Sequence, residues 1–480
     1  MKLSPAKIIL FTLSLLLFTS CDWLDTNTDV SSNPSFYSLK FAANDTIPGL
    51  EDAVFTLEWD ETLQDSIIVN LDSLPYQTDI THVIATFKFY STSTAELHML
   101  DTLKVKVDTI DFKTLTDTLD FTRVLRIKNT ASDEVTTSRS YPIKVNIHTV
   151  NPDKYIWKKI YDEIYSHSGS AQKAIYFNDS IFLYVNSGVN NYLYVSPSGS
   201  QWEQKAVTGL PMQSVVRNMY QFGGKLYLMH DENAIYSSSN GYTWTKADYS
   251  AENYKFINFL FDLKGKAWAV TQSKTDNTYR FAHSTNGSTW VITGEIPENF
   301  PIGDFAALSF YSRTNKPKAI VAGGFNTSGK LLKNVWSTED GMYWVDFSTE
   351  NTTFGSLAGA TMISYADEIL LFGGMDDEGN VAESPVMHSI DEGYSWSVPD
   401  SADNYIQELV ETTNGNKTDT SYVDYQPRSY QSVLYVVKQS PTQLYSQHFI
   451  YLIGGKNRTT VFKDVWTGKL NKLSFLREDN

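Results

Sequence analysis

The chain has 480 residues, of which 41% are hydrophobic and 14% aromatic, and its formal net charge is −16 with an isoelectric point near 5.0. This acidity argues against a nucleic-acid partner, because phosphates are bound by clustered Lys and Arg side chains. Cys21 is the single cysteine, so an intramolecular disulfide is excluded and packing must supply the stability.

Residues 1–20 predict a secretory signal peptide. Lys2 and Lys7 precede an apolar run from Ile8 to Phe18, which is too short for a membrane span of about 20 residues. Cys21, directly after two small residues, resembles the lipidated cysteine of a bacterial lipobox, although Phe18 stands where that family has an aliphatic residue. The alternative is a signal peptide that ends near a cysteine by chance.

The lipobox resemblance implies that Cys21 carries acyl chains, which would attach the protein to a membrane without a spanning segment. We therefore expect a cell-envelope lipoprotein of the outer membrane of a Gram-negative bacterium. Asp22 and Asp25 resemble the acidic export signals of lipoproteins in the Bacteroides group. Periplasmic and surface-exposed locations both stay open.

Residues 21–35 are polar and rich in turn formers, which predicts a tether. Residues 36–150 alternate apolar and polar side chains in segments such as "ATFKFYS", "LKVKVDTIDF" and "IKVNIH". This period of two is typical of half-buried strands. We predict an Ig-like antiparallel β-sandwich over 36–150.

A tryptophan repeat sets the period of residues 151–480. It recurs at intervals of 42 to 54 residues, at Trp157, Trp202, Trp244, Trp290, Trp344 and Trp396. Blades of β-propellers repeat at about 40 to 50 residues. The fold class is therefore predicted to be all-β, with a β-propeller after the sandwich.

Five of these tryptophans end a turn with a common pattern, of which "HSIDEGYSW" (388–396) and "STEDGMYW" (337–344) are two copies. The pattern resembles the Asp-box of sialidase-type propellers, which lies on the outer rim, away from the active site. A sialidase also needs an arginine triad, and only six arginines follow residue 157. We expect Asp391 and Trp396 to hold a hairpin at the rim.

Three diglycines, at 323–324, 373–374 and 454–455, follow apolar strands, and "KNVWST" and "KDVWTG" come after the first and the last of them. These features resemble the Kelch or galactose-oxidase-like propeller family. Six first hairpins are present, but the last unit has no closing tryptophan. We predict six blades, the last completed by the strand "DKYIWKKI" from the start of the domain.

We expect no cofactor and no metal. The copper chemistry of galactose oxidase requires a cysteine beside a tyrosine, and the eight histidines form no zinc motif. The acidic run "MDDEGN" (375–380) has oxygen ligands suited to Ca²⁺. A solvated turn is the commoner meaning of such a run.

The axial funnel of the propeller is the expected binding place. The segments before the innermost strands carry five candidate ligand-binding residues. They are Arg217, Lys255, Asp304, Tyr425 and Arg428. The alternative is that these side chains only satisfy one another.

The leading hypothesis is a membrane-anchored, non-catalytic lipoprotein whose propeller binds a glycan, a peptide or a protein. The alternative is a glycan-active propeller enzyme, a hydrolase or lyase with an unrecognised site, because the fold hosts both kinds of function. A structural role in an envelope complex is the third hypothesis.

Overall fold

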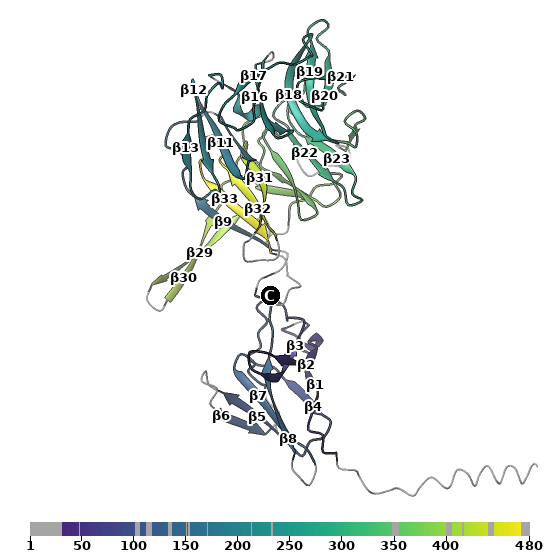
Figure 1. The fold of residues 1–480 in the computed structure, drawn as a ribbon, viewed down its shortest axis with the longest axis vertical. Coiled ribbons are helices and arrows are strands. Elements are labelled where there is room, and N and C mark those ends of the chain that lie inside the picture. Colours follow the sequence, from purple (N-terminus) through teal and green to yellow (C-terminus); the bar gives the residue numbers. More distant parts are fainter. Residues whose placement is uncertain are drawn as a thin grey trace, which may run out of the picture. The chain divides into compact units, whose positions relative to one another are not determined.

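The computed structural model describes residues 31–47, 49–100, 106–111, 118–132, 137–149, 151, 154–169, 171–212, 214–231, 234–347, 355–399, 406–414, 417–439 and 446–471. The predicted signal peptide, Cys21 and most of the predicted tether lie outside these residues. Up to residue 151 the described chain forms one compact unit, and from 154 to 471 a second. Both are built of strands, with two short 3-10 helices, η1 (Leu50–Asp52) and η3 (Val216–Asn218) (Figure 1). Within the described part of the chain, no helix is long and apolar enough to cross a membrane.

The N-terminal unit contains a two-stranded sheet, β1-β4, and a six-stranded sheet of order β2-β3-β8-β7-β5-β6. Its strands are β1 (Phe36–Phe41), β2 (Phe55–Asp60), β3 (Asp65–Asn70), β4 (Ala85–Phe89), β5 (Thr94–Leu100), β6 (Lys106–Asp111), β7 (Val124–Thr130) and β8 (Ser138–Lys144). Side chains from both sheets, including Phe41, Ile68 and Phe87, share one core. The prediction of purely antiparallel strands is wrong for β3 and β8, which pair in parallel. No hairpin joins these two strands, so no short turn imposes the antiparallel direction.

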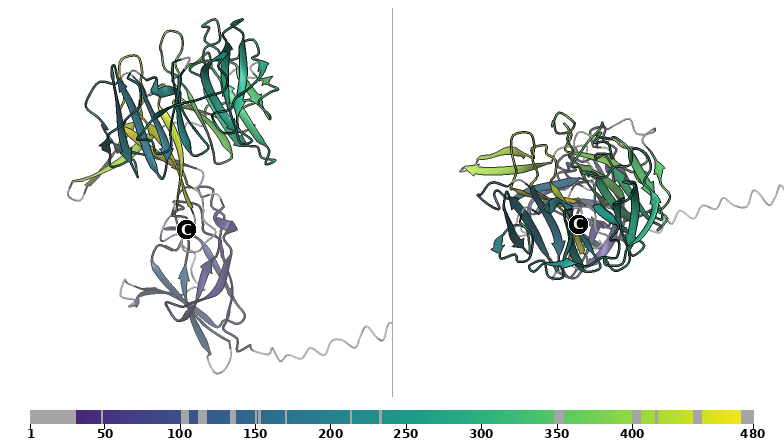
Figure 2. Two further views of the ribbon diagram at one scale, coloured as in Figure 1. Left: turned by 45° about the horizontal axis from the view of Figure 1, so that its top comes forward. Right: turned by 90° about the horizontal axis from the view of Figure 1, so that it is seen from above.

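Six sheets follow one another along the second unit, and Figure 2 shows them in order from teal through green to yellow. Sheet 1 contains β10 (Ala171–Phe177), β11 (Ser180–Ser187), β12 (Asn190–Ser196) and β13 (Glu203–Lys205); sheet 2 contains β14 (Met219–Phe222), β15 (Lys225–Asp231), β16 (Ala234–Ser238) and β17 (Thr245–Ala247); sheet 3 contains β18 (Tyr254–Leu263), β19 (Lys266–Ser273), β20 (Tyr279–Ser284) and β21 (Val291–Glu295).

Sheet 4 contains β22 (Ala306–Tyr311), β23 (Pro317–Ala322), β24 (Val335–Thr338) and β25 (Val345–Asp346); sheet 5 contains β26 (Thr361–Tyr365), β27 (Glu368–Phe372) and β28 (Val386–Ser389); sheet 6 contains β31 (Ser432–Gln439), β32 (Ser446–Ile453), β33 (Val465–Leu470) and β9 (Tyr155–Tyr161). A separate hairpin of β29 (Gln407–Asn414) and β30 (Lys417–Asp424) follows sheet 5 in the chain.

The second strand of each sheet is an apolar run because neighbouring sheets cover both of its faces. In β11 the six central residues of "SIFLYVNS" are all buried, and the last four residues of β23 and of β27 are buried as well. A strand exposed on one face would alternate apolar and polar side chains. Such continuous burial indicates sheets stacked face to face.

A separate hydrophobic core lies between each pair of neighbouring sheets, and one of the period-setting tryptophans lies in each core or packs against it. The tryptophans are Trp244 between sheets 1 and 2, Trp290 between sheets 2 and 3, Trp344 between sheets 3 and 4, Trp396 between sheets 4 and 5, Trp157 between sheets 5 and 6, and Trp202 between sheets 6 and 1. The core between sheets 6 and 1 joins Tyr451 and Ile453 to Leu183 and Val185. The first sheet therefore packs on the last.

The five predicted turns share the hydrogen bond from a glycine amide to a Ser or Thr side chain, and four of them add one from the tryptophan indole to the glycine carbonyl. In the turn that ends at Trp344, the amide of Gly341 donates to Thr338 Oγ1 at 2.8 Å, and the indole Nε1 of Trp344 donates to the Gly341 carbonyl at 3.1 Å. The glycine amide donates to a Ser or Thr oxygen at 2.7 to 2.9 Å in all five turns. Asp391 likewise accepts from the amide of Ser395, so this carboxylate holds its own hairpin.

Each turn glycine also lies against the second strand of the preceding sheet. A Cβ added to Gly341 would stand 2.3 Å from Trp268 Cε2 of β19. The other four contacts follow the same rule, and the pairs are Gly199 with Tyr451, Gly241 with Phe182, Gly287 with Tyr227, and Gly393 with Ile320. The turns therefore fasten one sheet to the next.

The strand β9 completes sheet 6, as the sequence predicts. It pairs with β33 in antiparallel register, with Trp157 opposite Gly468. Polar contacts also join sheets 6 and 1. The side-chain Nε2 of Gln172 donates to the Phe462 carbonyl at 2.9 Å. The amide of Ala174 donates to Ser432 Oγ at 2.7 Å.

Gly341→Ala should lower the free energy of unfolding by about 3 kcal/mol. A left-handed non-glycine residue costs about 1–2 kcal/mol and overpacking adds about 1–3 kcal/mol. Gly265→Ala is the matched control, because Gly265 has a similar φ of 70° but no neighbouring atom within 4 Å of an added Cβ. It should cost about 1 kcal/mol. Equal losses for the two variants in urea unfolding would contradict the fastening role of the turn.

Candidate functional site

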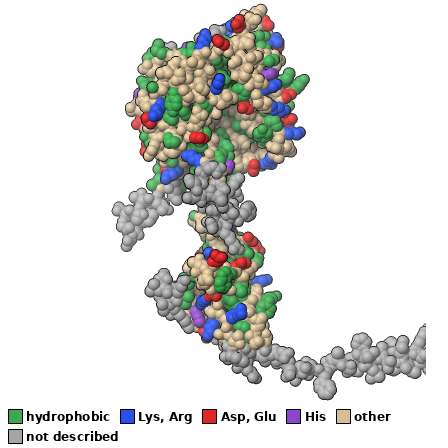
Figure 3. Space-filling model, viewed as in Figure 1, with side chains coloured by type: hydrophobic (Ala, Val, Ile, Leu, Met, Phe, Trp, Pro, Cys, Tyr) green, Lys and Arg blue, Asp and Glu red, His purple; other side chains and the backbone are tan. Residues whose placement is uncertain are grey.

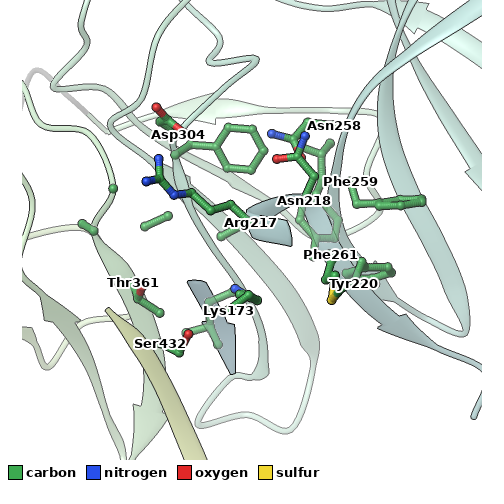
Figure 4. A pocket seen from close by; sticks show the side chains of 18 of the residues that line it. Lys173, Arg217, Asn218, Tyr220, Asn258, Phe259, Phe261, Asp304, Thr361 and Ser432 are labelled. Carbon is green, nitrogen blue, oxygen red and sulfur yellow. The ribbon is translucent and has the colours of Figure 1, made fainter. Parts of the chain in front are cut away.

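The first strands of the six sheets line one axial cavity of about 420 Å³. These strands are β10, β14, β18, β22, β26 and β31. The lining combines amide and hydroxyl groups with apolar side chains, several of them aromatic, and a few charged groups (Figure 4). A cavity of this size lies within the range of about 300–1,000 Å³ that is usual for small-molecule sites.

Three of the loops that lead into these strands are joined by backbone hydrogen bonds. The amide of Gly359 donates to the Asp304 carbonyl at 2.8 Å, and the amide of Tyr430 donates to the Gly359 carbonyl at 2.7 Å. All three residues have positive φ, of 51° at Asp304, 70° at Gly359 and 58° at Tyr430. Asp304 and Tyr430 carry a Cβ, so this conformation costs energy that the neighbouring loops must offset.

Tyr430 gathers charged groups at the entry of the cavity. Its hydroxyl donates to Asp304 Oδ2 at 2.9 Å, the guanidinium carbon of Arg217 lies 4.1 Å from the ring centroid, and Lys456 Nζ lies 5.0 Å from it. Burial, and then the Asp304 carboxylate, raise the pKa of Tyr430. Desolvation and the nearby Arg217 lower the pKa of Lys456. Cations on a ring face are attracted to its electrons.

Lys173 lies on β10 and lines the same cavity (Figure 4). Desolvation lowers the pKa of its ammonium below the ordinary value of 10.5, and no charged neighbour contributes to this shift. Among the described residues no carboxylate pairs with Lys173. An unpaired ammonium in such a place destabilises the fold.

The five candidate residues that the sequence indicates do not all lie at the same place in the structure. Arg217 and Asp304 line the axial cavity, whereas Lys255, Tyr425 and Arg428 are not among its lining residues. Lys255 is half-buried near the start of β18. Tyr425 is buried in the core between sheets 5 and 6.

Arg428 does not line the axial cavity. Its side chain is buried, and both terminal nitrogens donate to the carboxylate of Asp464. The guanidinium also lies over the rings of Tyr425 and Phe462. Arg428 therefore holds the last sheet together from inside, and the partner Asp464 is remote in sequence.

Sequence reasoning missed Lys173, Tyr430 and Lys456. The signal for Lys173 is a lysine within the innermost strand "AQKAIYF", where most neighbours are apolar. Lys456 follows the diglycine of sheet 6, at the position that Phe325 and Met375 take in the other two repeats. A cation at an otherwise apolar repeat position could have identified it.

The second unit is a β-propeller, and the axial cavity is its candidate site. Residues 151–478 match the DUF6242 beta propeller domain, and residues 33–145 match the domain of unknown function (DUF6242) N-terminal domain. The chain belongs to the DUF6242 family, and the predicted propeller is confirmed. No curated protein matches the chain.

Several solved structures are similar to this chain at low identity. A structure of YCF48 bound to D1 peptide is 13% identical and covers 73% of this chain and 87% of its own, with a TM-score of 0.30. An endo-arabinase from Bacteroides thetaiotaomicron is 9% identical, and the match covers 66% of this chain and 99% of the arabinase, with a TM-score of 0.30. A virginiamycin B lyase from Staphylococcus aureus with quinupristin is 8% identical, and the match covers 66% of this chain and 100% of the lyase, with a TM-score of 0.36. These likenesses concern the fold alone.

Lys173→Met should raise the free energy of unfolding at neutral pH, because the folded protein then no longer desolvates an unpaired ammonium. The pKa of Lys173 is lower in the folded than in the unfolded chain, so between the two values the unfolded chain binds more protons. The wild type should therefore gain stability relative to the variant as the pH rises through the lowered pKa towards 10.5. Urea unfolding across this range measures the difference.

The matched control is Lys246→Met on the exposed outer strand β17, which removes the same charge far along its sheet from the innermost strand. It should change stability little at any pH. A constant difference between the wild type and Lys173→Met at all pH values would contradict the desolvation of Lys173.

Proposed function

We propose that this chain is a binding protein of the bacterial cell envelope whose propeller holds a glycan in the axial cavity without cleaving it. One observation carries the proposal. The innermost strand of every sheet contributes to a single cavity, and most of its polar lining is amide or hydroxyl. Such groups both donate and accept hydrogen bonds, as sugar hydroxyls do.

The lining also offers a ring for the apolar face of a sugar. Phe305 is only partly buried and lies between Asp304 and the start of β22. Asn218 and Asn258 line the cavity from sheets 2 and 3 (Figure 4). An aromatic face with polar groups around it suits a ligand that has both apolar and hydroxyl surfaces.

The two carboxylates of the lining, Asp304 and Asp262, are the groups that bear on the choice between binding and hydrolysis. Glycosidases usually place two carboxylates about 5–10 Å apart across the scissile bond. Here Asp304 stands before the first residue of β22 and accepts from Tyr430, while Asp262 is the penultimate residue of β18. Burial raises the pKa of Asp262, and this favours the second candidate, a glycan-active enzyme with Asp262 as a general acid.

We read the six sheets as the blades of one six-bladed, Kelch-like ring that β9 seals. Three features support this reading: the pairing of β9 with β33, the core between sheets 6 and 1, and the positive φ of the three diglycines. The N-terminal unit is proposed to be an Ig-like sandwich that serves as a spacer. Its support is the single core shared by two sheets.

Thr361→Trp should abolish glycan binding, because Thr361 lines the cavity and an indole would fill part of it. Thr245→Trp on the exposed strand β17 is the matched control and should bind as the wild type does. A glycan array identifies the ligands, and titration calorimetry then compares the variants. Thermal unfolding checks that both variants are folded.

Equal binding by Thr361→Trp and the wild type would place the glycan outside the cavity and contradict the proposal. Cleavage of a bound glycan at an enzyme-like rate, lost in Asp262→Asn, would replace binding by hydrolysis. The same array and product chromatography give both answers.

We also propose that Cys21 is lipidated and anchors the protein to the outer membrane, with residues 21–35 as the tether. Cys21→Ser should abolish acyl labelling and release the protein from membranes, because the acyl chains are the proposed attachment. Metabolic labelling with a fatty-acid analogue and membrane fractionation test this. Retention of label and membrane association by the variant would refute the anchor.

A further inference from the structure

We propose that the glycan held in the axial cavity is acidic, and that Lys173 forms an ion pair with the carboxylate of a uronic-acid residue. This inference rests on the proposed function and names its substrate class. It also makes Lys173 the residue that separates acidic from neutral sugars.

The first support is the position of Lys173 within the cavity. The side chain lines the cavity from the innermost strand β10, and no described carboxylate pairs with it. The side chain is half-buried, desolvation lowers the pKa of its ammonium, and no carboxylate among the described residues compensates the charge. A ligand carboxylate would supply the missing partner, and charge-assisted hydrogen bonds of this kind are the strong ones.

The second support is a group of cations at the entry. Arg217 and Lys456 both approach the Tyr430 ring, whose hydroxyl donates to the carboxylate of Asp304. The positive charge of these two side chains would attract an anion that approaches the entry.

This local charge contrasts with the rest of the molecule. The net charge of the chain is −16, and on the face visible in Figure 3 basic and acidic side chains are interspersed over the second unit. Lys173, Arg217 and Lys456 all border the axial cavity or the small recess beside it, and the carboxylates of Asp262 and Asp304 line the same cavity. Cavity walls of low dielectric focus such a field on an entering anion.

The remaining lining favours a sugar acid over a bare anion. Asn218 and Asn258 offer amide groups for hydroxyls, and Phe305 offers a ring face for the C–H groups of a pyranose. A small inorganic anion would use none of these. An acidic peptide would present a flexible carboxylate without the ring, and it is the competing ligand to be tested.

The test uses titration calorimetry on the full chain with trisaccharides of galacturonate, glucuronate and mannuronate, each beside its carboxyl-reduced neutral counterpart. At least one acidic trisaccharide should bind about 10- to 100-fold more tightly than its counterpart, which is the usual effect of one hydrogen bond to a charged group. Lys173→Met should remove this preference, and Lys173→Arg, which keeps the charge, should retain it. Lys246→Met should behave as the wild type.

The outcomes separate this inference from the proposed function. Equal affinity for acidic and neutral trisaccharides would overturn the carboxylate assignment while glycan binding stands. No binding to any of the six would overturn it as well, and the glycan array alone would then decide the proposed function. Tighter binding of pentaglutamate than of every trisaccharide would overturn the sugar in favour of a peptide. Circular dichroism confirms the fold of each variant, with Lys173→Gln as the second test if Lys173→Met misfolds.

Discussion

The architecture depends on the packing of each rim turn against the sheet before it. A glycine with positive φ lets the turn approach a second strand, as Gly341 approaches Trp268, and a tryptophan from the same turn enters the core between the two sheets. An L-residue at the glycine would meet both a strained backbone and an occupied space. Sheet 6 has no such turn in its described residues, and β9 brings Trp157 into the core between sheets 5 and 6. One kind of contact thus sets the repeat length, the order of the sheets and the need for a strand from the start of the domain.

Fixing the sheets at the rim also fixes their first strands around the axis. Polar side chains on those strands are then held in a common cavity even where they form no hydrogen bonds or ion pairs with one another. Lys173 is the clearest case, since desolvation lowers the pKa of its ammonium and no carboxylate among the described residues pairs with it. Asp304 and Tyr430 add strained backbone at the entry. Natural proteins commonly keep such local instability where a ligand binds, and this is why the axis, and not the rim, is the proposed site.

The sequence predicts the parts of the fold that repeat. Tryptophan spacing and apolar second strands indicate a propeller because every sheet meets the same packing requirement, and the unmatched Trp157 correctly indicates the pairing of β9 with β33. Features that occur once are harder to predict. The direction of β8 beside β3 depends on contacts remote in the chain. The burial of the Arg428 side chain depends on Asp464, with which it forms an ion pair. The position of Lys173 in the cavity could not be predicted from the sequence, because the innermost strands of the five other sheets form the rest of the cavity wall.

Hydrogen–deuterium exchange of the full chain, with and without the tightest-binding trisaccharide, tests the central claim most directly. A ligand in the axial cavity should slow exchange in the segments that enter the innermost strands, at 303–309, 358–361 and 430–432, and leave exchange in the rim turns at 338–344 and 389–396 unchanged. Protection confined to the rim turns or to the N-terminal unit would show that the ligand binds elsewhere and would contradict the account.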